Sequence, residues 1–223
     1  VDGLGPEWVG LSVTMPGKFA ALALATERTE RAVAVGSANT LVRTDSGWRA
    51  DCTDVDGVTG ALGAVGVHDL SGASAIVVGA GGTSRPALVA LRDLGAVAVT
   101  VVSRDEERAG GALACARDAG LTARWSAPDD GDLPGQVADA AAVVSTVPSE
   151  GGAAMIDALR GARVLLDAIY HPWPTPLADA VEKSGGVVVG GLEMLLHQAF
   201  GQVEQFTGRP APRAAMERAL RES

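Results

Sequence analysis

A glycine-rich loop is the first part of the sequence whose residue types and spacing suit a ligand. It lies in the run I-V-V-G-A-G-G-T-S-R, residues 76–85, between an apolar strand-like stretch and an Ala/Leu-rich helix. Glycines permit a tight turn and let backbone N–H groups approach a pyrophosphate, and the following helix adds its positive N-terminal dipole. A plain strand–turn–helix joint is the alternative, because the usual G-x-G-x-x-G fingerprint lacks its last glycine. The βαβ setting favours dinucleotide binding. The predicted loop contacts are Gly79, Ala80, Gly81, Gly82 and Thr83.

The end of the next strand indicates which dinucleotide is bound. Residues 101–108 read V-V-S-R-D-E-E-R, and Ser103 and Arg104 stand where an NAD site places an acid for the ribose 2′-hydroxyl. Arg104 and Arg108 are four residues apart, so both side chains can face one side of the helix start. Two guanidinium groups would hold a 2′-phosphate, which favours NADP over NAD. The alternative is a solvated, salt-bridged helix start, since Asp105 and two glutamates lie between the arginines.

An isolated lysine, Lys18, is the second feature of the sequence that could take part in a reaction. Lys18 ends the stretch S-V-T-M-P-G-K, which follows a strand-like run and precedes six uncharged residues, F-A-A-L-A-L. A lone lysine in a turn is more commonly a surface residue. Asp54, in the run D-C-T-D-V-D-G, is by itself best interpreted as a helix cap, and its neighbours Asp51 and Asp56 as solvated carboxylates at the helix start. Residue types alone therefore do not decide whether Lys18 and Asp54 take part in a reaction.

The first part of the chain contains short elements that must position these groups. Residues 9–13 predict a buried strand, and residues 17–28 predict a helix with Pro16 in its first turn. The runs T-L-V-R-T, D-S-G and W-R-A-D, residues 40–51, predict a β-hairpin with D-S-G as the turn. Residues 54–65 predict a helix, because apolar residues recur there at helical spacing.

Five short apolar runs after residue 73 predict parallel strands. The first enters the glycine-rich loop, and the others are residues 97–104, 141–147, 163–169 and 185–190. They alternate with helices, including a charged helix at 105–119, and this alternation indicates a parallel sheet covered on both faces. The predicted fold class is therefore α/β: a Rossmann-type doubly wound parallel sheet with a smaller α/β unit.

The predicted domain organisation follows from a change in the composition of the sequence. A polar turn cluster, H-D-L-S-G-A-S at 68–74, is the candidate boundary before the dinucleotide unit. Two helices, 192–207 and 212–221, close the chain. The predicted domains are a nucleotide-binding domain of residues 55–191 and a substrate or catalytic domain of residues 1–54 and 192–223. The active site is expected in the cleft between them.

Composition limits the possible partners. The chain has 223 residues, 27 acidic against 18 basic side chains and a net charge of −9. An acidic chain without a basic stripe argues against nucleic acid or an anionic membrane as a partner. Cys52 and Cys115 show no metal-ligand spacing, so no metal site is predicted and a reduced compartment is the simpler interpretation. Without a membrane-spanning run or a signal peptide, the expected location is the cytoplasm, as a monomer or homodimer.

Five motifs together resemble a known family. S-V-T-M-P-G-K, G-S-A-N-T-L and D-C-T-D-V-D-G come in this order before the glycine-rich loop. With Y-H-P-W-P-T-P at 170–176 and G-L-E-M-L-L-H-Q-A at 191–199, the arrangement resembles the shikimate dehydrogenase family over essentially the whole chain. The resemblance implies reversible reduction of 3-dehydroshikimate to shikimate with NADPH, in chorismate and aromatic amino acid synthesis.

The resemblance also implies roles for individual residues. Lys18 and Asp54 match the family's catalytic pair. Hydride reduction of a ketone leaves negative charge on oxygen, which an ammonium group can stabilise and protonate while a carboxylate orients it. The implied substrate contacts are Thr14, Asn39, Asp54, Tyr170 and Gln198. The implied cofactor contacts beyond the glycine-rich loop and the two arginines are Thr146, Ile169 and Gly191.

Three departures from the family pattern are expected to matter. Family members usually carry a Ser-x-Ser motif for the substrate carboxylate before the lysine motif, and this sequence begins at Val1 without it. If that region is missing, exposed apolar surface, oligomerisation or weak substrate binding would follow. Cys52 and Ser12 each replace an expected asparagine. Two other functions compete with the main one: an NAD-dependent quinate/shikimate dehydrogenase, and a non-catalytic NADP-binding regulatory protein.

Overall fold

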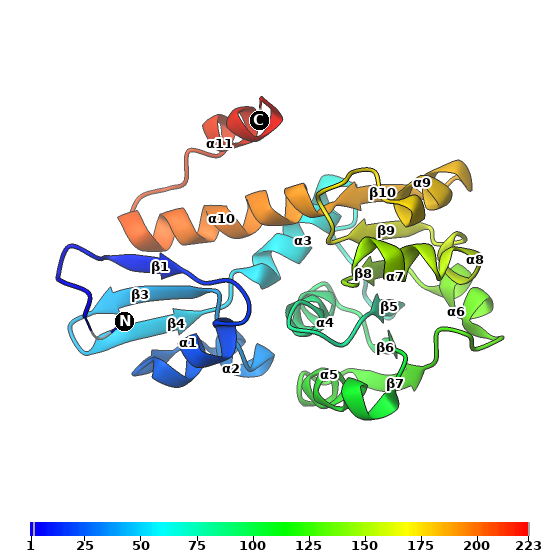
Figure 1. Cartoon of the computed structure of the whole chain (residues 1–223), viewed down its shortest axis with the longest axis horizontal. Coiled ribbons are helices and arrows are strands. Elements are labelled where there is room, and N and C mark those ends of the chain that lie inside the picture. The colour runs from blue at the N-terminus through cyan, green and yellow to red at the C-terminus, as the bar shows by residue number, and fades with distance from the viewer. Residues whose placement is uncertain (2, 223) are drawn as a thin grey trace.

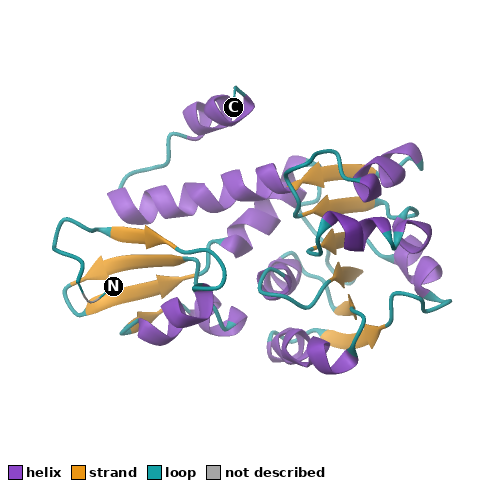
Figure 2. Cartoon of the chain, in the orientation of Figure 1, coloured by secondary structure: helices purple, strands orange, loops and turns teal. Residues whose placement is uncertain are grey.

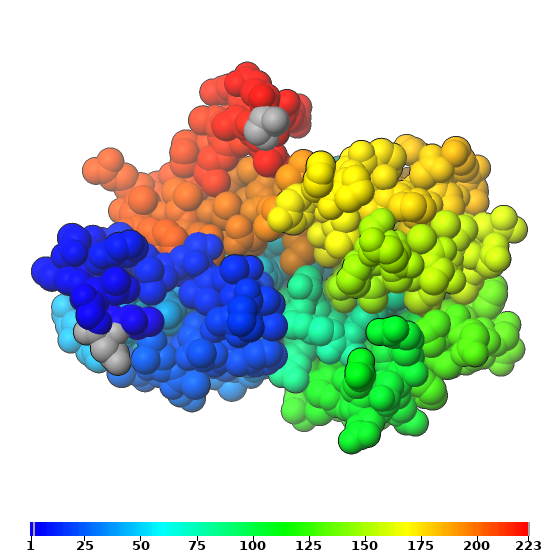
Figure 3. Space-filling model, in the orientation of Figure 1, coloured from blue at the N-terminus to red at the C-terminus, as the bar shows by residue number. Residues whose placement is uncertain are grey.

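Two β-sheets, joined by two helices, make up the protein (Figure 1). The computed structural model describes residue 1 and residues 3–222. Asp2 and Ser223, which fall in the predicted substrate domain, lie outside the described residues. The space-filling view shows two lobes that meet across a recess, with the N-terminal segment on one side (Figure 3).

The first sheet has four strands in the order β1-β3-β4-β2. Their bounds are β1 (Gly10–Ser12), β2 (Glu27–Arg28), β3 (Thr40–Thr44) and β4 (Gly47–Asp51). β3 and β4 form the predicted hairpin, in which Thr44 pairs with Gly47. β1 is antiparallel to β3, and β2 is parallel to β4. Helix α1 (Lys18–Leu24) packs against β4, and helix α2 (Glu30–Val35) leads back into β3.

Two predictions for this half were wrong. The helix predicted at 17–28 ends at Leu24, and the chain then forms β2 and α2. Thr29 caps the N-terminus of α2, and its hydroxyl accepts a hydrogen bond from the Ala32 amide at 3.2 Å. The strand predicted as buried, β1, is an edge strand that is only partly buried. A short apolar run does not reveal whether the sheet continues beyond it, so the sequence alone could not distinguish edge from centre.

The second sheet confirms the predicted doubly wound fold. It has six parallel strands in the order β10-β9-β8-β5-β6-β7. Their bounds are β5 (Ser74–Val78), β6 (Ala98–Val102), β7 (Thr122–Ser126), β8 (Ala142–Ser145), β9 (Val164–Asp167) and β10 (Val187–Gly190). Only β7 was not predicted. Its sequence, T-A-R-W-S, alternates polar and apolar residues because it lies at the edge of the sheet, so it lacks the continuous apolar run of a central strand.

Alternation along the strands builds two hydrophobic cores, one on each face. On β5, Ala75 and Val77 belong to one core, while Ile76 and Val78 belong to the other. The first core is closed by α3 (Asp54–Ala64), α4 (Ser84–Asp93) and α5 (Glu106–Asp118). The second is closed by α6 (Leu133–Asp139), α8 (Ile156–Leu159) and α9 (Pro176–Lys183), with α7 (Ser149–Ala153) against α9 (Figure 2).

Helices α3 and α10 (Gly191–Thr207) cross between the two sheets. α3 runs from β4 toward the second sheet, and α10 follows β10 and returns beside the first (Figure 1). They pack closely along each other: a Cβ added at Gly57 would lie 2.7 Å from the Met194 carbonyl oxygen. This close approach brings the α10 side chains to the start of α3. The last helix, α11 (Arg213–Arg221), stands off the body and buries none of its residues.

In the part of the chain that the structure describes, no helix combines the length and apolar character that crossing a bilayer requires.

Candidate active site

Lys18 and Asp54 form an ion pair at the junction of α1 and α3. Each is the first residue of its helix. The Lys18 Nζ lies 2.5 Å from Asp54 Oδ2, and the two side chains are only 12% and 8% exposed. Lys18 is therefore not a free surface residue. An ammonium group held in one orientation by a carboxylate could act as a general acid.

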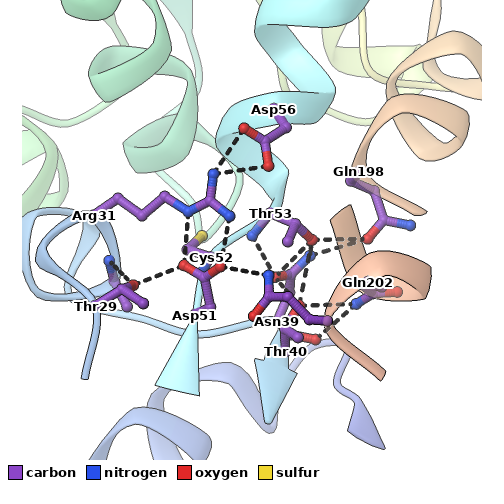
Figure 4. A network of polar contacts seen from close by, with 12 residues as sticks. Thr29, Arg31, Asn39, Thr40, Asp51, Cys52, Thr53, Asp56, Gln198 and Gln202 are labelled. Atoms are coloured by element: carbon purple, nitrogen blue, oxygen red, sulfur yellow. Dashed lines mark hydrogen bonds and ion pairs between the residues drawn. The ribbon is translucent and has the colours of Figure 1, made fainter. Parts of the chain in front are cut away.

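Asn39 holds the other oxygen of the carboxylate. Its Nδ2 donates to Asp54 Oδ1 at 3.0 Å and lies 2.9 Å from Thr53 Oγ1, while its Oδ1 accepts from the Thr53 amide at 2.8 Å. Asn39 is buried, just before β3. Because Lys18 and Asn39 take different oxygens, the Asp54 carboxylate has a fixed orientation. Figure 4 shows the contacts of Asn39 with Thr53, just before α3, and with the α10 glutamines Gln198 and Gln202.

Helix α10 contributes two glutamines to the same cluster. The Gln198 Oε1 accepts from Asn39 Nδ2 at 3.0 Å, which brings this predicted substrate contact to the network. Gln202 was not predicted; its Nε2 donates to the Asn39 carbonyl and to Thr40 Oγ1, both at 3.1 Å. Its spacing of four residues from Gln198 places both side chains on one helix face, and this spacing is the signal that could have identified it.

Two predicted substrate contacts stay outside this network. Thr14 is exposed in the turn between β1 and α1, and its carbonyl accepts from the Gly17 amide at 2.9 Å. Tyr170 is 52% exposed in the loop that follows β9. Among the described residues, neither side chain makes a hydrogen bond. Both remain available to a ligand, and their roles stay predictions.

The glycine-rich loop lies where the strand order of the second sheet reverses, between β5 and β8. Gly79 has φ +104°, and a Cβ there would lie 2.5 Å from Thr146 Oγ1, so glycine is required. The Thr146 amide and hydroxyl both donate to the Val78 carbonyl, at 2.8 and 2.9 Å. Open parallel sheets bind ligands at this kind of reversal, outside the carboxyl ends of the strands.

A cavity of about 920 Å³ opens beside this loop. Of the predicted cofactor contacts, its walls include Ala80, Gly81, Ser103, Arg104 and Arg108. Sequence reasoning missed other wall residues, namely Pro128, Val147, Pro148, Glu150, Gly151, Ala154 and Met155. Several of these follow β7 or β8, and the carboxyl ends of neighbouring parallel strands share one edge of the sheet. That rule could have identified Pro148 and Glu150, whereas Pro128 follows the unpredicted strand.

The two arginines differ in their surroundings. Arg104 is exposed and has no ion-pair partner in the described part of the chain, whereas Arg108 Nε lies 3.8 Å from Asp105 Oδ2. The other Asp105 oxygen caps α5 by accepting from the Glu107 amide at 2.8 Å. Ser103 is held by Trp125, whose Nε1 lies 3.1 Å from the Ser103 hydroxyl. The Arg104 guanidinium is therefore the freer of the two to receive an anion.

The remaining predicted cofactor contacts lie outside that cavity. Ile169 and Gly191 are joined by a hydrogen bond from the Gly191 amide to the Ile169 carbonyl at 3.1 Å, at the start of α10. Gly82 faces the lysine turn, because a Cβ there would lie 2.9 Å from Met15 Sδ. Thr83 directly precedes α4 and is partly exposed. The loop and the lysine turn are thus neighbours, although more than sixty residues separate them in sequence.

Comparison with known proteins identifies the family. A shikimate dehydrogenase (NADP(+)) of Halobacterium salinarum is 40% identical over 220 residues, which cover 95% of this chain and 78% of the relative. The chain belongs to the shikimate dehydrogenase family. The family model for the shikimate 5'-dehydrogenase C-terminal domain matches residues 191–221, which hold α10 and α11.

Solved shikimate dehydrogenases have the same fold. The structure from Mycobacterium tuberculosis is 56% identical with a TM-score of 0.93, over 100% of this chain and 82% of that chain. The structure from Thermus thermophilus, in complex with NADP(H) and shikimate, is 28% identical with a TM-score of 0.77, over 97% and 80%. The expected Rossmann-type architecture is therefore confirmed by solved members of the family as well as by the sheet order.

One prediction about the acidic motif was wrong. Asp51 was expected to be a solvated carboxylate, but it is only 3% exposed and bound to Arg31. Asp56 is partly exposed and also bound to Arg31. Helix α2 was not predicted from the sequence, so no position was predicted for Arg31, which lies on it.

Cys52, the residue that departs from the family's asparagine, lies completely buried and contacts Asp51 and Asp54. Its Sγ is 4.0 Å from Asp54 Oδ2. Burial raises the pKa of the Cys52 thiol to about 12, with the Asp54 charge acting in the same direction. The thiol is therefore neutral at physiological pH.

Proposed function

We propose that this protein catalyses the reversible, NADP-dependent reduction of 3-dehydroshikimate to shikimate, a step of chorismate and aromatic amino acid synthesis. The observation that carries the proposal is the buried Lys18–Asp54 ion pair beside a dinucleotide loop, in a chain of the shikimate dehydrogenase family. Residues 1–54 and 192–223 would hold the substrate, and residues 55–191 would hold the cofactor.

The residues of the nucleotide site suit NADP. The cavity beside the glycine-rich loop has room for an extended ligand, and the loop leads into the N-terminus of α4, where backbone amides and the helix dipole would suit a pyrophosphate. Arg104 and Arg108 would hold the 2′-phosphate. Thr146, Ile169 and Gly191 would line the approach to the reacting end. When bound, NADPH supplies a hydride to the ketone carbon of the substrate.

Lys18 would then act on the ketone oxygen. Its ammonium group stabilises the negative charge that develops there and donates a proton to the alcohol product. In the oxidation direction, the neutral amine accepts the hydroxyl proton. Asp54 keeps the ammonium group oriented and compensates its charge, and Asn39 fixes the carboxylate through its second oxygen.

Polar groups around this pair would bind the hydroxyls of the substrate. Asn39, Asp54 and Gln198 already share hydrogen bonds, and the hydroxyls of the exposed Thr14 and Tyr170 make none within the described part of the chain. A ring substrate placed on Lys18 would exchange some of these contacts for bonds to its own hydroxyls. The exposed Tyr170 would close over it from the other sheet.

The direct test is shikimate oxidation with NADP, followed by the absorbance of NADPH. Quinate in place of shikimate and NAD in place of NADP are the controls. We expect the pair shikimate and NADP to give the highest kcat/KM by at least about tenfold, since an unsatisfied buried polar or charged group costs at least that factor. A protein that binds NADPH without turning over shikimate would overturn the proposal, and a preference for quinate with NAD would replace it.

A further inference from the structure

Arg31 binds two carboxylates that belong to different elements. From α2, its Nε and Nη2 donate to the two oxygens of Asp51 at 2.6 and 2.5 Å. Its Nη1 donates to both oxygens of Asp56 at 2.7 Å. Asp51 is the last residue of β4 and Asp56 lies in the first turn of α3. One guanidinium therefore spans the junction at which the chain leaves the first sheet (Figure 4).

Asp51 is the centre of this cluster. Besides Arg31, it accepts hydrogen bonds from the Thr29 hydroxyl at 2.7 Å and from Gln205 Nε2 at 2.7 Å. Gln205 lies on α10, so the cluster also holds the second helix that crosses between the sheets. Burial alone would raise the pKa of Asp51, but the hydrogen bonds from Arg31 and Thr29 outweigh it and lower the pKa to about 2. The carboxylate therefore stays ionised.

A short chain of contacts links this cluster to the Lys18–Asp54 pair. The Cys52 amide donates to Asp51 Oδ1 at 2.8 Å, and the Cys52 thiol lies against Asp54. The next amide, of Thr53, donates to Asn39. Cys52 is thus held by the two aspartates that flank it, and Thr53 is held from outside the segment by Asn39. The direction in which Asp54 leaves the backbone therefore depends on where Asp51 is anchored.

We propose that Arg31 is a positioning residue for the proposed reaction. It contacts neither the Lys18–Asp54 pair nor the nucleotide cavity. It fixes the junction of β4 and α3, together with α10, so that Asp54 and Gln198 meet Lys18 and Asn39 in one geometry. The inference rests on the proposed function and adds a residue, outside the catalytic groups, on which the rate depends.

The test compares Arg31→Met with Arg43→Met. Arg43 is a matched arginine on β3 that donates to the Trp8 carbonyl at 2.9 Å and stacks on Trp48, with no contact to residues 51–56. For Arg31→Met we expect kcat to fall roughly 10- to 100-fold, because small misplacements of catalytic groups cost that much. The primary isotope effect with NADPH deuterated at the transferred hydrogen should rise, since the chemical step becomes slower. NADPH affinity should stay within about twofold, because its site lies on the other sheet.

Control variants separate positioning from simple loss of stability. Arg43→Met should lower the melting temperature but leave kcat per folded molecule and the isotope effect unchanged. Arg31→Lys keeps the charge but not the planar fork, so it should fold and recover only part of kcat. In Arg31→Met/Asp51→Asn, the more deeply buried of the two carboxylates is replaced by a neutral amide, so stability should return more than kcat does.

Each outcome has a distinct meaning. If Arg31→Met or Arg31→Lys lowers only the melting temperature, with kcat and the isotope effect as in the wild type, the positioning role is wrong while the proposed function stands. If the wild-type protein itself does not oxidise shikimate with NADP, the proposed function fails, and this role fails with it.

Discussion

The surroundings of Lys18 and the cavity beside the glycine-rich loop differ in how far their polar groups are already paired. Around Lys18, nearly every polar group is already hydrogen-bonded to another: Lys18 to Asp54, Asp54 to Asn39, and Asn39 to Gln198. Around the cavity, Arg104 is exposed without an ion-pair partner in the described chain, and a Cβ at Gly81 would meet open space. The first region is set before any ligand arrives, whereas the second presents groups for a ligand to satisfy.

This difference fits the two proposed roles, catalysis around Lys18 and cofactor binding in the cavity. Groups that stabilise a transition state are most effective when no reorganisation is needed at the moment of reaction, so their neighbours must hold them. A site for a large anionic cofactor instead gains affinity from new charge-assisted hydrogen bonds. Substitutions in the first region should therefore act mainly on kcat, and substitutions in the second mainly on cofactor affinity.

The largest expected effect is that of Lys18→Ala. Removing the proposed proton donor should lower kcat roughly 10³- to 10⁴-fold, while the Kd for NADPH stays within about threefold. Steady-state kinetics and calorimetric titration with NADPH measure the two quantities. A variant with wild-type kcat would eliminate the catalytic assignment. A variant that lost NADPH binding would contradict the expectation that this region acts mainly on kcat.

Arg104→Ala should show the reverse pattern. We expect NADPH to bind roughly 10- to 100-fold more weakly while NADH binding hardly changes, because only NADPH carries the 2′-phosphate. Arg108→Ala is the matched control, and it should have a smaller effect because Arg108 already lies near Asp105. Equal weakening of both cofactors by Arg104→Ala would contradict the proposed phosphate contact.

The smallest effect concerns acid stability. The pKa of Asp51 is about 2 in the folded protein against an ordinary value of 3.8. The unfolded chain therefore binds this proton more readily, so the stabilisation is complete above about pH 4 and is lost as the pH falls through 2. The contribution is about 2 kcal/mol of unfolding free energy.

Asp51→Asn isolates that contribution in urea unfolding between pH 4 and pH 2. Burial raises the pKa of Asp56 and of Asp167, so these carboxyls oppose the trend and absolute stabilities are not diagnostic. The variant should show a flatter pH dependence than the wild type. Parallel curves for the two proteins would show that Asp51 is not the group responsible.

Much of the site could be predicted because its signals are local. Gly79 is needed where the chain turns with positive φ next to Thr146, and the motif order around Lys18, Asn39 and Asp54 resembles the family. The missed residues have weaker signals or none. Gln202 has only its spacing of four residues from Gln198 on the predicted helix, and Pro128 follows the edge strand β7, whose sequence is not a continuous apolar run.

Periodicity, glycine placement and motif order are properties of short segments, so the class of fold, the glycine-rich loop and the proposed catalytic pair could be predicted from the order of the amino acids. The contacts of Arg31 with Asp51 and Asp56, the place of Gln205 beside them and the edge positions of β1 and β7 became clear only from the folded chain. These outcomes depend on which segments pack together, and a charged residue does not encode its partner twenty or more positions away. The same carboxylate can be a solvated cap or the buried centre of a network, and only packing distinguishes the two.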